Sequence, residues 1–181
     1  VLLTGQAIAQ GQNAFSINGT VDKFDTSTIT LKHINSEAVE TFKLSPNLLV
    51  LQNKRVTLND IKPNDFIASA AVRMADGKLH STELRIFPEA LRGVGDGQRP
   101  MNDARNQTMT NATVTGTVIV GGSNNVKVKF AGGDSELILY PGVQVITIMA
   151  VDRSLVKAGM PVRAQGAKTA DGLLITRITL E

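Results

Sequence analysis

Two stretches of this chain follow the same order of alternating apolar residues, tight turns and a short helical turn. A Gly-Thr-Val triplet at residues 19–21 returns at residues 116–118, and an Asp-Gly pair at residues 76–77 returns at residues 171–172. Matching segments in one order are the mark of an internal repeat. We therefore interpret the chain as two copies of one small unit.

Within the first copy, apolar and polar residues alternate with a period of two, which is typical of strands that bury one face. Pro46 is expected to end the third strand. Thr57 can cap the helical turn that follows, with Asp60 at the third position of a capping box. The Asp-Gly pair predicts a hairpin between the last two strands. The five strands are expected around residues 17–21, 28–32, 41–44, 66–73 and 78–87.

Three strands, a helical turn and two further strands are the order of an OB-type barrel. The chain is therefore predicted to be all-β, with two tandem five-stranded OB-like barrels. Barrel 1 spans residues 16–87, barrel 2 spans residues 111–181, and residues 88–110 form a structured linker between them. Gly19 and Gly116 fall within strands, where a small barrel needs a bend or a bulge.

The composition excludes several classes of protein. With 42% hydrophobic and 19% charged residues the chain resembles a folded domain, and the absence of Cys excludes disulfides, thiolate catalysis and Cys-based zinc sites. The net charge of +3 comes without a dense basic stripe, and Tyr140 is the lone aromatic residue expected on an outer strand face. These features argue against nucleic-acid binding, because proteins that bind single strands need aromatic side chains on which the bases stack. No apolar run approaches the roughly 20 residues of a membrane span.

The first residues indicate export. Residues 1–3 are apolar, and Ala7-Ile8-Ala9 fits the small-x-small pattern of a signal-peptidase site before the chain turns polar. We assign residues 1–15 to a signal-peptide remnant or a flexible N-terminus, the alternative being a frayed end that happens to hold two alanines. The predicted location is periplasmic or secreted.

The predicted linker contains the candidate binding residues. Acids and arginines alternate there, at Glu89, Arg92, Asp96 and Arg99. Such a set can present guanidinium groups to a carboxylate or phosphate in the crevice between two barrels, where ligands often bind. The same set can instead form ion pairs that clamp the linker. The sequence leaves both interpretations open.

Other chemical constellations are weaker. His33 and His80 have no spacing that pairs them with each other or with a nucleophile. A calcium site from Asp96, Asn102 and Asp103 fits no loop spacing that we can name. No nucleophile–base pair and no cofactor motif is visible, so we predict no metal, no cofactor and no enzymatic activity.

The copies resemble an uncharacterised family of secreted bacterial proteins, the domain-of-unknown-function family numbered 5666. The resemblance lies in the Gly-Thr-Val openings, in the text Leu-x-x-Ile-Lys-Pro-Asn-Asp at residues 58–65, and in residues 86–93, which look like a segment that links repeats. It would cover nearly everything from Ser16 onward. The second copy departs from the pattern, with Ala-Gly-Met at residues 158–160. The resemblance implies an OB-like barrel and export, and it supplies no catalytic residues.

These observations favour a non-enzymatic exported binding or interaction module of the bacterial cell envelope. Its partner would be a protein or a small anionic ligand. The alternative is an OB protein that binds an oligonucleotide or an oligosaccharide on its sheet face.

Overall fold

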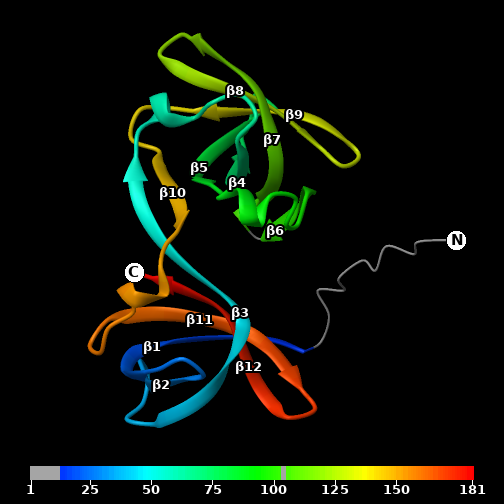
Figure 1. Cartoon of the computed structure of the whole chain (residues 1–181). Helices are drawn as coiled ribbons and strands as arrows, with labels where there is room; N and C mark the ends of the chain where they lie inside the picture. The colour runs from blue at the N-terminus through cyan, green and yellow to red at the C-terminus, as the bar shows by residue number, and fades with distance from the viewer. Residues whose placement is uncertain (1–12, 103–104) are drawn as a thin grey trace, which may run out of the picture. The chain divides into compact units, whose positions relative to one another are not determined.

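The computed structural model describes residues 13–102 and 105–181, and within these ranges it contains β-strands and short 3₁₀ turns but no α-helix (Figure 1). The chain is all-β, with a closed five-stranded barrel and additional strands, as predicted at this level. The residues proposed as a signal-peptide remnant lie largely outside the described residues. The strands are β1 (Ala14–Phe24), β2 (Thr28–His33), β3 (Val39–Val56), β4 (Phe66–Arg73), β5 (Leu79–Ile86), β6 (Gly97–Asn102), β7 (Gln107–Val120), β8 (Ser123–Phe130), β9 (Gly133–Leu139), β10 (Gln144–Ala150), β11 (Pro161–Thr169) and β12 (Gly172–Leu180). The 3₁₀ turns named below are η1 (Leu58–Asp60), η2 (Glu89–Leu91) and η4 (Arg153–Leu155).

The chain divides into two compact units whose bounds differ from the predicted ones. Unit 1 combines the residues up to Gln52 with Val151–Glu181, and unit 2 is Asn53–Ala150. The chain leaves unit 1 within β3 and returns to it after β10. Residues 88–110, predicted to be a linker between barrels, are part of unit 2, where β6 pairs with β7.

In unit 1 the strand pairing closes on itself. β2 pairs antiparallel with both β1 and β3, β3 pairs parallel with β12, and β11 pairs antiparallel with both β12 and β1. The inward positions form an apolar core that includes Ile29, Leu31, Ile175 and Ile178, each fully buried. Strands from the two predicted copies therefore share one core.

Unit 2 repeats this circuit with the roles of the copies reversed. β8 pairs antiparallel with β7 and β9, β9 pairs parallel with β5, and β4 pairs antiparallel with β5 and β7. Its core includes Ile67, Leu84, Leu137 and Leu139. The closing hairpin β4–β5 comes from the first predicted copy, whereas β7, β8 and β9 come from the second. In unit 1 the closing hairpin β11–β12 comes from the second predicted copy, whereas β1, β2 and β3 come from the first.

The register of the strands identifies which positions correspond. The β1–β2 ladder shifts after Val21 and the β7–β8 ladder after Val114, while the closing hairpins shift before Ala71 and before Gly166. A bulge inserts a residue on one strand and bends the sheet, so matching bulges indicate matching curvature. The two circuits thus agree in strand order, direction and bulge position.

Backbone contacts correct one part of the predicted repeat. The Val21 N–H donates to the Met160 carbonyl at 2.9 Å, and the Val114 N–H donates to the Asp65 carbonyl at 2.8 Å. Val21 therefore corresponds to Val114 and not to Val118. The match between the two Gly-Thr-Val triplets is wrong by four residues, because the hairpin after Val114 is longer.

Two local predictions have different outcomes. The turn after β3 is present as η1, and the Thr57 N–H and Oγ1 both donate to the Asp60 carboxylate, at 2.8 and 2.9 Å. Pro46, predicted to end a strand, lies inside the continuous strand β3. The β2–β3 ladder stops at Lys43 and the β3–β12 ladder resumes at Leu49, so Pro46 falls where no ladder requires its missing N–H.

Candidate functional site

Two of the predicted binding residues form an ion pair on the turn η2. The Arg92 Nε donates to Glu89 Oε1 at 2.7 Å, and the Arg92 Nη2 donates to the Asn64 carbonyl at 2.8 Å. The hydrogen bond from Arg92 holds the pKa of Glu89 below its usual value, and Glu89 in turn raises the pKa of Arg92. Arg92 thus ties the segment after β5 to the loop before β4.

The other two predicted residues also bind backbone of unit 2. Asp96 Oδ1 accepts from the Ala131 N–H at 3.1 Å, and the Arg99 Nη1 donates to the Gly95 carbonyl at 2.8 Å. Asn111 fastens the same loop by donating to the Val94 carbonyl at 2.9 Å. Only Glu89 and Arg92 form an ion pair, and the contacts of Asp96 and Arg99 are to backbone of the same unit. A binding role for the four residues stays a prediction.

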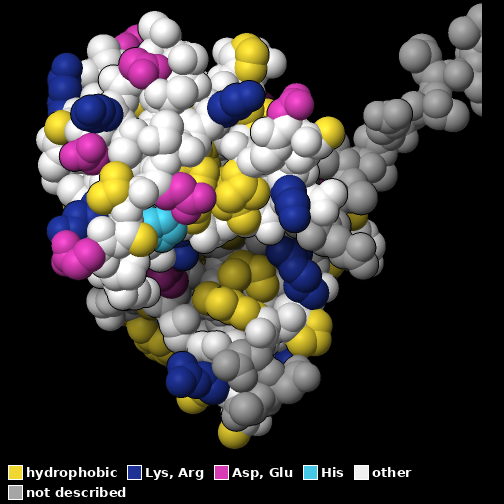
Figure 2. Space-filling view, turned by 90° about the horizontal axis from the view of Figure 1, so that it is seen from below, with side chains coloured by type: hydrophobic (Ala, Val, Ile, Leu, Met, Phe, Trp, Pro, Cys, Tyr) yellow, Lys and Arg dark blue, Asp and Glu magenta, His cyan; other side chains and the backbone are white. Residues whose placement is uncertain are grey.

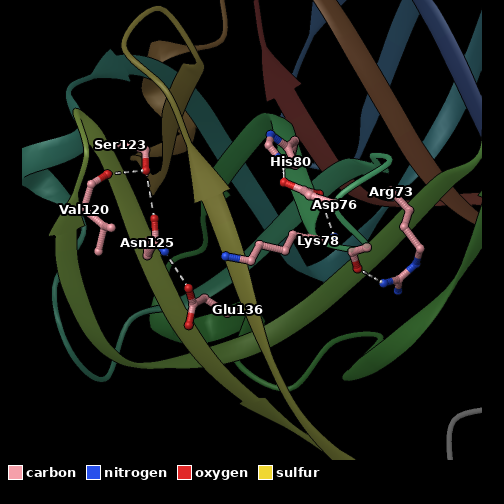
Figure 3. A network of polar contacts seen from close by, with 9 residues as sticks. Arg73, Asp76, Lys78, His80, Val120, Ser123, Asn125 and Glu136 are labelled. Atoms are coloured by element: carbon pink, nitrogen blue, oxygen red, sulfur yellow. Dashed lines mark hydrogen bonds and ion pairs between the residues drawn. The ribbon is translucent and has the colours of Figure 1, made fainter.

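A pocket of about 300 Å³ opens elsewhere on unit 2, where the β4–β5 hairpin meets β9. Arg73 and Lys78 lie on the two sides of the turn that joins β4 to β5, and Glu136 lies on β9. In Figure 3 the Lys78 side chain extends across β9 toward Glu136. The pocket is lined by Arg73, Gly77, Lys78, Leu79, Ser135, Glu136 and Ile138.

The turn of the hairpin is held in shape by its own side chains (Figure 3). Gly77 has a φ of 76°, and its carbonyl accepts from the Arg73 Nη1 at 2.7 Å. The Asp76 carboxylate accepts from the Lys78 N–H at 2.9 Å and contacts His80 Nε2 at 2.8 Å. These hydrogen bonds, the one from the Lys78 N–H above all, lower the pKa of Asp76. The two cations therefore project from a rigid turn.

A row of buried polar side chains orients the carboxylate of the pocket. The Ser123 Oγ lies 2.9 Å from Asn125 Oδ1, and the Asn125 Nδ2 donates to Glu136 Oε1 at 2.5 Å. Ser123 and Asn125 are only 5% and 7% exposed. Because Asn125 is buried and both ends of its amide are hydrogen-bonded, its orientation is fixed, and it positions the Glu136 carboxylate before any ligand arrives.

An aromatic pair joins β5 to the end of β9, with His80 on β5 and Tyr140 directly after β9. The rings of His80 and Tyr140 stack with centroids 5.6 Å apart, and Tyr140 remains about half exposed. A ring held on one side and open on the other can stack on a sugar or a base. The pocket therefore offers two cations and one oriented carboxylate, and the aromatic face lies outside its lining in the same unit.

The sequence did not predict most of this site. His80 and Tyr140 were noted, whereas Arg73, Lys78 and Glu136 were not. The Asp-Gly pair was the available signal, since a tight turn brings the residues on its two sides close together. Asn125 gave no signal, because a polar residue on an outward position is expected to be solvated.

Unit 1 has a contrasting hollow. A pocket of about 410 Å³ lies between β1 and the loop after β2, and its lining includes His33 but no Lys or Arg. His33 contacts Glu40 at 3.1 Å, so the two histidines have separate acidic partners, one in each unit. Among the described residues no group of three or more His, Asp or Glu is placed to hold a metal ion.

Neither the distribution of surface charge nor comparison with known proteins indicates a function. Figure 2 shows basic and acidic side chains interspersed over the face in view, without a continuous basic patch. A search of the described residues finds no helix with the length and apolar character needed to cross a membrane. No protein-family model, curated protein or solved structure matches the chain.

Proposed function

We propose that this chain is a non-enzymatic binding module of the bacterial cell envelope, and that it holds a small anionic ligand in the pocket of unit 2. The pocket with Arg73 and Lys78 at its rim is the observation that supports this proposal. Cations that project from a hairpin fixed by its own hydrogen bonds lose little entropy when an anion binds. Export is supported by the pattern at residues 7–9 and by the resemblance to the secreted family.

The fold that we propose for both circuits is an OB-like barrel, derived from a duplicated unit. Support comes from the shared circuit, from the matching bulges, and from the turns η1 and η4, which directly precede the closing hairpins β4–β5 and β11–β12. Each barrel is then closed by the hairpin of the other copy. Exchange of identical elements between repeats is a low-cost rearrangement, because every contact has an equivalent.

A second candidate function is the binding of an oligosaccharide or oligonucleotide. The half-exposed Tyr140, stacked on His80, favours it, as do the oriented carboxylate of Glu136 and the position of the pocket beside the hairpin of the last two strands. OB-type barrels bind such chains with strands two and three and with that hairpin. A carboxylate accepts hydrogen bonds from sugar hydroxyls and repels the repeated phosphates of a nucleic-acid backbone, so within this second candidate an oligosaccharide fits better than an oligonucleotide.

Titrations followed by amide NMR would test these functions. We expect inorganic phosphate or a short oligogalacturonide to shift the amides of residues 73–79 and 135–138, with weaker shifts in higher salt because the attraction is ionic. Lys78→Ala should weaken binding by about tenfold, the loss of one charge-assisted hydrogen bond. Lys168→Ala is the matched control, an exposed lysine in unit 1 that should leave affinity unchanged.

The outcomes separate the candidates. Shifts with phosphate and the oligogalacturonide alike support the anion site, and shifts with a neutral oligosaccharide that also move Tyr140 support the glycan face. Binding of oligo-dT that follows Tyr140 rather than Lys78 would favour a nucleic-acid function. If no probe moves these amides at millimolar concentration, the proposed site is wrong.

A further inference from the structure

The hairpin β7–β8 is longer than its counterpart β1–β2. Leu31 lies ten positions after its partner Val21 (31 − 21), whereas Val128 lies fourteen positions after its partner Val114 (128 − 114). Since Val21 and Val114 occupy corresponding places, the second hairpin carries four additional residues. The additional length lies at the tip, where Gly121 and Gly122 have φ values of 53° and 85° and make the turn.

The extended tip exposes large apolar side chains. Val118, Ile119 and Val120 are 46%, 78% and 54% exposed. In Figure 1 the hairpin between the labels β7 and β8 reaches beyond the strands that it pairs with in unit 2. Three consecutive apolar residues exposed on both faces of a ribbon are not explained by the core of the unit.

One edge of this ribbon also lacks a strand partner among the described residues. β7 pairs with β4 as far as Thr113 and with β6 as far as Asn111, while residues 116–120 pair only with β8. Backbone N–H and C=O groups on an open edge are a template for another strand. What fits here is therefore an extended chain, not merely an apolar surface.

The open edge carries none of the usual protection against such pairing. Residues 106–126 contain no Asp, Glu, Lys, Arg or His. The corresponding place in the first copy ends differently, because Asp25 closes a tight turn by accepting from the N–H groups of Ser27 and Thr28, at 2.8 and 2.7 Å. Those hydrogen bonds lower the pKa of Asp25 to about 2, so a charge stays at that edge. The hairpin of unit 1 is therefore protected against pairing with another strand at the place where the hairpin of unit 2 is not.

We propose that residues 116–120 of β7 pair, antiparallel and edge to edge, with the same segment of a second copy of this chain. An antiparallel pair about a two-fold axis uses one patch twice, so the open groups and the apolar side chains of each copy meet their equivalents. The absence of charge makes the segment compatible with itself, since no like charges face each other across the pair. The edge is short, and the resulting dimer is concentration-dependent.

Sedimentation velocity of the 181-residue chain, from micromolar to millimolar concentration, measures this association. The weight-average mass should rise from 19.3 kDa toward twice that value. Ile119→Lys places like charges across the pair and should raise the dimer Kd by about tenfold or more. Ile34→Lys is the matched control: Ile34 is 68% exposed in unit 1 and its replacement should leave the Kd unchanged. Circular dichroism confirms that both variants fold.

Hydrogen exchange separates strand pairing from loose apolar contact. The amides of residues 116–120 should gain protection as the dimer forms, and amides of unit 1 should not. The proposal is overturned by a mass that stays at the monomer value, by association that Ile119→Lys leaves intact, by equal loss in both variants, or by dimers without protection at this edge.

Discussion

At the scale of single residues, the two mid-strand glycines show how similar sequence contexts carry different constraints. A Cβ on Gly19 would lie 2.6 Å from the Lys32 carbonyl oxygen, whereas a Cβ on Gly116 would meet nothing within 4 Å. The sequence assigned both to a bend. Only Gly19 allows the close approach of a neighbouring backbone, because the β7–β8 hairpin is longer and the two positions are not equivalent.

We therefore expect Gly19→Ala to destabilise unit 1 by about 1–3 kcal/mol, the usual cost of forcing an atom into a packed sheet. Gly116→Ala should change stability by less than about 1 kcal/mol, with stabilisation the expected sign because the unfolded chain loses freedom. Urea unfolding followed by circular dichroism measures both. Equal effects of the two substitutions would contradict the assigned register.

At the scale of elements, alternation predicted most strands, though not β6 or β10, and could not predict which strands pair. The closing hairpin β4–β5 was found within a residue or two of its ends, and the Asp-Gly turn was correct. Inward-facing apolar residues such as Ile67 and Leu84 can pack into any apolar core, and the cores of unit 1 and unit 2 are alike in composition. Nothing in the pattern says which core the hairpin enters.

The residues of the unit 2 pocket could not be predicted from the sequence for a related reason. Arg92 and Glu89 formed the conspicuous charged pattern, and they bind each other and the backbone. Lys78 and Glu136 lie far apart in the chain and come together only when β5 and β9 pair in parallel. Pairing between distant strands is a property of the fold that local spacing does not record.

Core truncation in the closing hairpins tests which barrel each one supports. Leu84 and Ile178 occupy corresponding places, and both are fully buried. Leu84→Ala should cost about 2–5 kcal/mol and deprotect β7, β8 and β9 in hydrogen exchange. Ile178→Ala should cost a similar amount and deprotect β1 and β2 instead.

Sequential barrels would give the opposite pattern. If Leu84→Ala opened β1 and β2 while β7 and β8 kept their protection, each hairpin would belong to the barrel of its own copy. Mass spectrometry of proteolytic fragments resolves these strands, since their residues do not overlap.

At the scale of the whole molecule, the exchange of closing hairpins that we propose unites the observations on the fold. It explains why the chain crosses between units within β3 and after β10, and why residues 88–110 belong to unit 2. It also accounts for the fact that the units do not divide at the boundary between the two predicted copies. Unit 1 is assembled from two stretches that are far apart in sequence, whereas unit 2 is the contiguous stretch Asn53–Ala150, so neither unit coincides with a predicted barrel.

Disulfide trapping tests the exchange most directly, because the chain has no cysteine of its own. Asn18 of β1 lies opposite Arg163 of β11, and the Arg163 Nε donates to Asn18 Oδ1 at 3.3 Å. In sequential barrels Asn18 would instead face Ala68, which here lies opposite Asn111. A disulfide forms only where the two Cα atoms lie within about 7 Å.

We predict that the double variant Asn18→Cys, Arg163→Cys forms an intramolecular disulfide under mild oxidation, identified by peptide mass mapping. The variant Asn18→Cys, Ala68→Cys should keep both thiols free within the monomer. A disulfide in the second variant and free thiols in the first would contradict the exchange.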